Sequence, residues 1–185
     1  MTRKIVVAVP SRPEFVRYLK TRIPDVEFCF DMEAVGAMQN TMNAWKMAGE
    51  DPVLMMEDDI ILTVGFNERV EEEIQKRPNE IIQFFSMRSD DLTKGSRYDR
   101  KFAMNQCYYL PKGYASLLLE YASNWSRRYE AGAYYDIMMD EFLRGRKEKY
   151  WIHVPSLVQH RDGKSMIHQS RSSKRQSKTF VNAWE

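Results

Sequence analysis

The chain has 185 residues, of which 43% are hydrophobic and 29% charged, as in an ordinary globular protein. This length fits one domain with its own core, and no apolar run approaches the roughly 18 residues that a membrane-spanning helix needs. The net charge of +2 is unevenly spread, because residues 161–178 hold six Lys or Arg against one acid and leave 22 basic and 25 acidic residues elsewhere. We therefore expect one domain over residues 1–165 and a basic C-terminal tail over 166–185.

Strand and helix patterns alternate through the first half of the chain. Continuous apolar runs predict strands, and apolar residues at helical spacing predict amphipathic helices. On this basis we expect strands at 5–10, 26–31, 52–59 and 81–87, and helices at 13–23, 33–48 and 66–77. The polar residues 89–101 indicate a loop.

The second half is less regular. Residues 102–111 resemble a strand, 112–125 and 134–146 resemble helices, and 150–160 resembles a final strand broken by Pro155. The Ser-rich stretch that follows predicts a flexible or ligand-ordered tail. Cys29 and Cys107 lie in apolar runs without metal or disulfide spacing, which indicates buried free thiols of a cytoplasmic protein.

The order of these elements predicts an α/β fold with a mainly parallel sheet flanked by helices. In such sheets ligands bind outside the carboxyl ends of the strands. Polar clusters follow three predicted strands there: Ser11 with Arg12, then Asp31, then Glu57 with Asp58 and Asp59. The sequence therefore places a binding site at this edge.

The acidic triplet Glu57-Asp58-Asp59 needs a physical reason. Two like charges about 4 Å apart repel by roughly 4 kcal/mol at an effective dielectric near 20. Protonation, exposure to water or a bound cation could each relieve that repulsion, and Mg²⁺ or Mn²⁺ prefers carboxylate oxygens together with substrate phosphates. Because the triplet ends the strand expected over 52–59, we expect Glu57 and Asp59 to point to one face and Asp58 to the other.

Two motifs in this context resemble the GT-A nucleotide-sugar glycosyltransferases. The segment EDDIILTVGF resembles their acidic "DXD-type" strand end, and VPSLVQHRDGKS, about 100 residues later, resembles their closing segment. The likeness covers most of residues 4–165 and implies a Rossmann-like GT-A fold. It also implies that Asp59 and His160 bind Mn²⁺ or Mg²⁺.

The same resemblance implies a donor pocket for a nucleoside diphosphate sugar, with UDP-sugar as the expected donor. The residues that match donor-contacting positions are Pro10, Ser11, Arg12, Asp31, Gly36, Asn40, Glu57 and Asp58, with Arg161 and Lys164 adding positive charge. Asp31 could instead cap the helix that follows, and Arg161 and Lys164 could serve solubility alone.

The catalytic base is expected in the helix at 134–146. YYDIMMDEFL resembles the family's "DD-x-x-L" pattern, which aligns Asp136 with the leading acid, although Ile137 replaces the second. Asp140 lies one turn further on the same face and is the second candidate. In an enzyme that retains configuration, these acids would orient the acceptor instead.

The acceptor is left open between a glycan and modified DNA. Compact enzymes of this kind occur in bacteria and phages, where some glycosylate hydroxymethylated DNA bases, and the basic tail suits a polyanion. One rival is a metal-dependent nucleotidyl- or phosphoryl-transferase, although residues 8–14 lack the glycines of a phosphate loop. Another is a non-catalytic nucleic-acid-binding module, which would not explain the acidic cluster.

Overall fold

The computed structural model describes residues 1–128, 134–161 and 175–184. A seven-stranded sheet in the order β2-β1-β3-β7-β5-β8-β6 forms its centre, and β4 and β9 form a separate pair. The strands are β1 (Arg3–Ala8), β2 (Val26–Phe30), β3 (Val53–Glu57), β4 (Ile60–Leu62), β5 (Ile82–Gln83), β6 (Arg97–Asp99), β7 (Cys107–Leu110), β8 (Tyr150–Ile152) and β9 (Val158–His160). The helices are α1 (Pro13–Arg22), α2 (Ala37–Ala48), α3 (Phe66–Lys76), α4 (Asp91–Lys94), α5 (Tyr114–Asn124) and α6 (Tyr135–Gly145).

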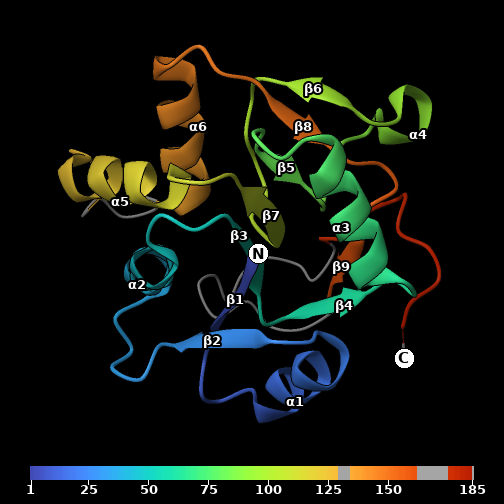
Figure 1. The fold of residues 1–185 in the computed structure, drawn as a ribbon, viewed down its shortest axis with the longest axis horizontal. Helices are drawn as coiled ribbons and strands as arrows, with labels where there is room; N and C mark the ends of the chain where they lie inside the picture. Colours follow the sequence, from blue (N-terminus) through green and yellow to red (C-terminus); the bar gives the residue numbers. More distant parts are fainter. Residues whose placement is uncertain (129–133, 162–174, 185) are drawn as a thin grey trace.

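The predicted α/β class is confirmed. β2, β1, β3, β5 and β8 run in one direction, while β7 and β6 run in the other, so the sheet is mixed but mainly parallel. Helices cover both faces: α2, α5 and α6 lie on one side and α1 and α3 on the other (Figure 1).

The side-chain alternation of β3 divides the core between these two layers. Val53 and Met55 pack with α2, α5 and α6, whereas Leu54 and Met56 pack with α1 and α3. All four side chains are buried, as the continuous apolar run predicted for a strand with both faces covered. The strand ends at Glu57, and the chain then bends before β4.

Several predicted boundaries change in the structure. The strand expected over 52–59 stops at Glu57, and the residues that follow Asp59 form the short strand β4, which the sequence patterns did not indicate. Pro155 divides the last predicted strand into β8 and β9, as expected. The loop expected over 89–101 contains α4 and the edge strand β6.

The C-terminal residues 175–184 pack against the body of the domain. Ser177 and Thr179 are buried and hydrogen-bond with Ser156, while the Trp184 N–H donates to the Leu62 carbonyl at 2.7 Å. The rest of the predicted tail, 166–174 and residue 185, lies outside the described residues. None of the described helices is long and apolar enough to cross a bilayer.

Candidate functional site

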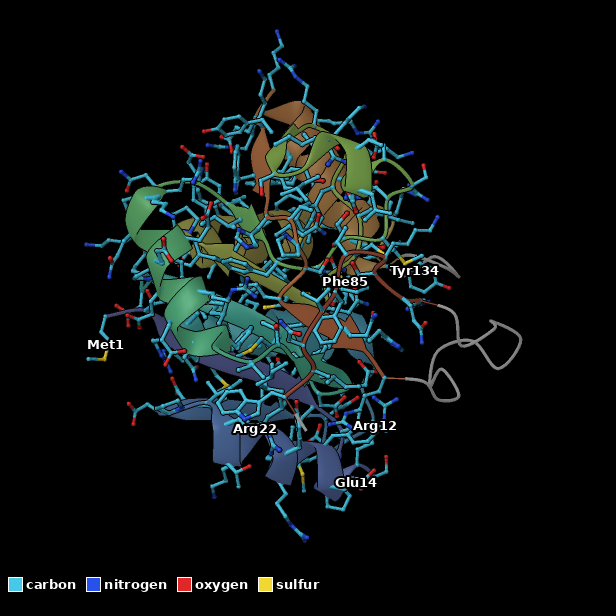
Figure 2. All side chains as sticks on the ribbon, turned by 90° about the vertical axis from the view of Figure 1, so that its right-hand side faces the viewer. Met1, Arg12, Glu14, Arg22, Phe85 and Tyr134 are labelled. Atoms are coloured by element: carbon cyan, nitrogen blue, oxygen red, sulfur yellow. The ribbon has the colours of Figure 1, made fainter. Side chains whose placement is uncertain are left out.

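A pocket of about 330 Å³ lies where β1, β2 and β3 end. In Figure 2, Met1 before β1 and Arg12 after it lie on opposite sides of the molecule, so the carboxyl end of β1 faces the same side as Arg12 and Tyr134. The predicted site residues that line the pocket are Arg12, Asp31, Gly36, Asn40, Glu57, Asp58, Asp59 and His160. The strand ends therefore bring most of the predicted residues together.

Arg12 is the cation that lies among the acids. Its Nη1 donates to Asp58 Oδ1 at 2.8 Å and to Asp59 Oδ2 at 2.9 Å, and the Val9 N–H donates to Asp58 Oδ2 at 2.9 Å. Both carboxylates thus contact one guanidinium, and the expected opposite orientation of Asp58 and Asp59 is wrong. The reason is that β3 ends at Glu57, so strand alternation does not extend to the next two residues.

Glu57 is held by neutral partners instead. The Tyr135 hydroxyl donates to its Oε1, and the Gln106 amide donates to its Oε2 at 3.1 Å. Burial and the neighbouring charge of Asp59 raise the pKa of Glu57 to about 7. The repulsion within the triplet is therefore relieved by Arg12 on two of its acids, while burial and the charge of Asp59 disfavour the charged form of the third.

His160 reaches Asp59 through the pairing of two short strands. β4 and β9 are antiparallel with Ile60 opposite His160, and the Arg161 N–H donates to the Asp59 carbonyl at 2.8 Å. This register puts His160 Nε2 3.4 Å from Asp59 Oδ2. Burial lowers the pKa of His160, but the bond to Asp59 and the carboxylate charges outweigh it, so the net shift is upward.

Asp59 and His160 are the side chains that could bind a divalent ion. Burial raises the pKa of Asp59, but His160 and Arg12 outweigh it and hold the pKa below its usual value, so the carboxylate is ionised. Asp59 Oδ1 is buried and has no hydrogen-bond partner among the described residues, and the same holds for His160 Nδ1. The described residues contain no group of three His, Cys, Asp or Glu arranged for a metal. Two protein ligands fit Mg²⁺ or Mn²⁺ when donor phosphates and waters supply the others.

Asn40 and Asp31 shape the pocket through bonds to the chain. The buried Asn40 amide donates to the carbonyls of Ala8 and Cys29, at 3.3 and 3.2 Å, and so ties α2 to β1 and β2. Asp31 accepts the N–H groups of Val35 and Gly36, at 2.7 and 3.0 Å, just before α2. Asp31 thus fixes the turn that leads into α2, but it does not cap the helix, because the N–H groups that it accepts precede Ala37 and the N-cap residue Gly36 has no side-chain capping bond.

Gly36 is the N-cap residue just before α2 and has a φ of 92°, a conformation that L side chains rarely adopt. This backbone conformation is therefore enough to explain why a glycine stands at this position of the pocket rim. Cys29 and Cys107 are buried free thiols, as predicted.

Other predicted residues do not line the pocket. Pro10 and Ser11 are exposed beside it. Arg161 stacks on Phe15 and Tyr18, with its Cζ 4.7 and 4.4 Å from the ring centres, and so lies outside the pocket lining. Lys164 lies outside the described residues.

The two candidate bases also lie outside the pocket lining. Asp140 accepts the Phe102 N–H at 2.9 Å and pairs with Arg144 at 3.0 Å, so both of its oxygens have structural partners. Asp136 lies at the start of α6, next to Tyr135, which does line the pocket.

The polar lining residues that the predicted donor, metal and base sets do not contain are Thr41, Tyr135 and Arg175. Tyr135 adjoins the predicted Asp136, and Thr41 follows the predicted Asn40, so their neighbourhood carried a signal. Arg175 belongs to the C-terminal segment, and no local pattern distinguished it from the other basic residues there. Its charge lowers the pKa values of both Glu57 and His160, which places it near them.

No family model matches the chain, and a search of curated proteins finds no match. Solved structures do resemble it. A197 from STIV is 12% identical with a TM-score of 0.52, covering 85% of this chain and 84% of that one. A protein assigned as a glucose-1-phosphate thymidylyltransferase from Bacillus anthracis, solved with sucrose, is 11% identical with a TM-score of 0.53 and covers 86% and 89%.

UDP-glucose pyrophosphorylase from Acinetobacter baumanii is 10% identical with a TM-score of 0.47, covering 81% of this chain and 61% of that one. At these identities a likeness shows the fold alone. The chain shares the Rossmann-like, mainly parallel α/β fold of the first two of these structures, with its pocket where the parallel strands end.

Proposed function

We propose that this protein transfers a sugar from a nucleoside diphosphate donor, with UDP-sugar as the first to test, to a hydroxyl acceptor. The observation that supports this most is the meeting of Asp59 and His160, 101 residues apart in the chain, at 3.4 Å in a pocket at the strand ends. Two guanidinium groups, those of Arg12 and Arg175, line the same pocket and suit an anionic donor.

In this proposal Asp59 and His160 hold Mg²⁺ or Mn²⁺ together with the donor's phosphates. The bound ion would neutralise the charge that develops on the leaving nucleoside diphosphate. Arg12 already contacts Asp58 and Asp59, so it holds the acids in place before the donor arrives. Asp31 and Gly36 form the rim beside the nucleoside, and Asn40 fixes the strands beneath it.

For an inverting reaction, Asp136 is the proposed base. Both oxygens of Asp140 are engaged with Phe102 and Arg144, whereas Asp136 stands beside the pocket residue Tyr135 with one oxygen bonded to its own helix. A carboxylate in this position would accept the proton of the acceptor hydroxyl.

The test is a thermal-shift panel of UDP, GDP and dTDP with and without Mn²⁺, followed by transfer from the matching labelled donor. Asp59→Asn and His160→Ala should abolish the Mn²⁺-dependent part of the shift, while Asp51→Asn, an exposed acid outside the pocket, should not. A ligand at 100 times its dissociation constant stabilises by about 2.7 kcal/mol, which such a panel detects readily. If no nucleoside diphosphate stabilises the wild-type protein, the proposal is wrong.

A nucleotidyltransferase is the second candidate, because the fold resembles that of the thymidylyltransferase. The chain between β1 and α1, residues 9–12, contains no glycine, which argues against a phosphate loop there. The reaction products separate the two: a nucleotidyltransferase given a nucleoside triphosphate and a sugar phosphate releases pyrophosphate, whereas a glycosyltransferase releases the nucleoside diphosphate from its sugar donor.

The acceptor is proposed to be a hydroxyl of a glycan or of a hydroxymethylated DNA base. Labelled transfer from a UDP-sugar panel to modified DNA and to oligosaccharides decides between them, since label incorporated only into the glycan would exclude the DNA acceptor.

A further inference from the structure

Guanidinium groups and aromatic rings alternate along α1, on the outside of the pocket. Arg12 lies 5.7 Å from the centre of the Phe15 ring, and Arg161 lies 4.7 Å from that ring and 4.4 Å from the Tyr18 ring. Arg22 continues the stack at 4.1 Å from Tyr18 and 5.8 Å from Trp184. We call this set the arginine row; it consists of Arg12, Phe15, Arg161, Tyr18, Arg22 and Trp184.

Two of the three arginines in the row have no ion-pair partner among the described residues. Arg12 is paired with Asp58 and Asp59, but in the described part of the chain neither Arg22 nor Arg161 forms an ion pair. Arg17 and Lys20, which are exposed on α1, have none in that part of the chain either, but helical spacing puts them about 100° or more around the helix from Phe15, Tyr18 and Arg22. By contrast, Lys76 and Arg77 at the end of α3 are both paired with glutamates. The acids of the segment, Glu14 and Asp25, are exposed near its two ends.

The row is held in a fixed geometry. The Tyr18 hydroxyl donates to the Trp184 carbonyl at 2.7 Å and accepts the Leu62 N–H at 2.9 Å. Arg22 and Arg161 both stack on this ring, so two like charges are held close together. An anion bound beside both guanidinium groups would relieve their repulsion.

Stacking also decides which part of each arginine is available. A guanidinium that lies on a ring keeps the N–H groups at its edge for other partners. Part of this edge is already used here, because Arg161 Nε donates to the Ile60 carbonyl and Arg22 Nη1 donates to Thr21 Oγ1, both at 3.2 Å. The remaining N–H groups of the two guanidinium groups suit the oxygens of a phosphate. Because the rings already contact the arginines, they are not free for bases to stack on. The row is therefore suited to phosphate groups and not to base recognition.

We propose that the arginine row binds the phosphodiester backbone of a single-stranded nucleic acid and leads it to the pocket. Arg12 belongs to both the row and the pocket lining, and Figure 2 shows Arg12 and Arg22 at the two ends of α1. The ten residues of α1 span about 15 Å, room for several nucleotides. The inference rests on the proposed function in that the bound strand would be the acceptor, and it narrows the acceptor to a polynucleotide.

The test measures binding of a fluorescent 12-mer of oligo-dT by anisotropy between 50 and 200 mM salt. The two unpaired arginines of the row, Arg22 and Arg161, predict a slope of log K against log salt of about −1.4 for a single strand, at about −0.7 per phosphate contact. Arg22→Gln combined with Arg161→Gln should weaken binding at least tenfold and remove most of the slope. Arg17→Gln with Lys20→Gln changes exposed side chains on another side of the same helix and should leave the slope unchanged. Lys46→Gln with Lys112→Gln, exposed cations elsewhere, is the matched control and should change neither quantity.

Each outcome decides the matter. Absence of oligonucleotide binding, or equal loss in the Lys46/Lys112 control, would overturn the proposal. A heparin fragment of equal charge that competes as well as oligo-dT would also overturn it, because the row would then accept any polyanion. UDP-induced thermal shifts on the same samples report on the pocket: a protein that binds oligo-dT but no nucleoside diphosphate contradicts the proposed function and leaves the row standing.

Discussion

Replacing Arg12 with Gln tests how the acidic triplet is tolerated. The Arg12 and Asp59 side chains are each 17% exposed and that of Asp58 is 5% exposed, so the substitution would leave two carboxylates largely buried without their guanidinium. Removing one partner of a buried ion pair costs about 3–5 kcal/mol. Asp58 keeps the Val9 N–H and Asp59 keeps His160, which favours the lower end, about 3 kcal/mol.

For a domain of this size, about 3 kcal/mol corresponds to a fall in Tm of roughly 6–12 °C. Urea and thermal unfolding at neutral pH measure it, with Arg17→Gln, an exposed arginine on the same helix, as the control that should change stability by less than about 0.5 kcal/mol. If Asp59 also binds a divalent ion, Mn²⁺ should raise the Tm of Arg12→Gln more than that of the wild type. A loss below about 1 kcal/mol would refute the role given to Arg12.

Three further predictions follow from individual side chains. Asn40→Ala should lower the free energy of unfolding by about 2–3 kcal/mol, because buried carbonyls lose their donor; an unchanged urea midpoint would contradict this. Burial lowers the pKa of His153 below its usual value near 6.5, so as the pH falls the unfolded chain takes up the proton before the folded chain does. The free energy of unfolding should therefore fall as the pH drops below about 6.5. The urea midpoints at pH 7.5 and 5.5 should differ less in His153→Gln than in the wild type, and an equal difference would contradict this role of His153. Asp136→Asn should reduce the kcat of transfer by about 10²–10⁴-fold, whereas Asp140→Asn should mainly lower the Tm, because Asp140 binds the Phe102 N–H. If steady-state kinetics show the large loss of kcat in Asp140→Asn instead, the base is Asp140.

The parts of the fold that depend on local pattern were predictable. The apolar run before Glu57 and the order of strands and helices indicated a buried parallel sheet, and strand ends in such a sheet share an edge, which brought Arg12, Asp31 and the acids together. The approach of His160 to Asp59 was expected only through the family resemblance, because it depends on the β4–β9 register, which joins segments about 100 residues apart.

What local pattern could not predict depends on side-chain contacts at a distance. The expectation that Asp58 and Asp59 point to opposite faces was wrong because it assumed that the strand continued past Glu57. Arg12 was expected to contact the donor, and its part as the counterion of two acids required the bend after β3. Arg175 was one basic residue among several, and its arrival at the pocket follows from the packing of Ser177 and Thr179 on the body.

The most direct measurement is the dissociation constant of UDP, determined by calorimetry with Mn²⁺ and with EDTA, for the wild type, Asp59→Asn and the Asp51→Asn control. We expect Mn²⁺ to tighten binding at least tenfold in the wild type and the control, and this gain to vanish in Asp59→Asn. Equal UDP affinity with Mn²⁺ and EDTA in the wild type, or a full Mn²⁺ gain in Asp59→Asn, would contradict a donor site built on Asp59 and His160.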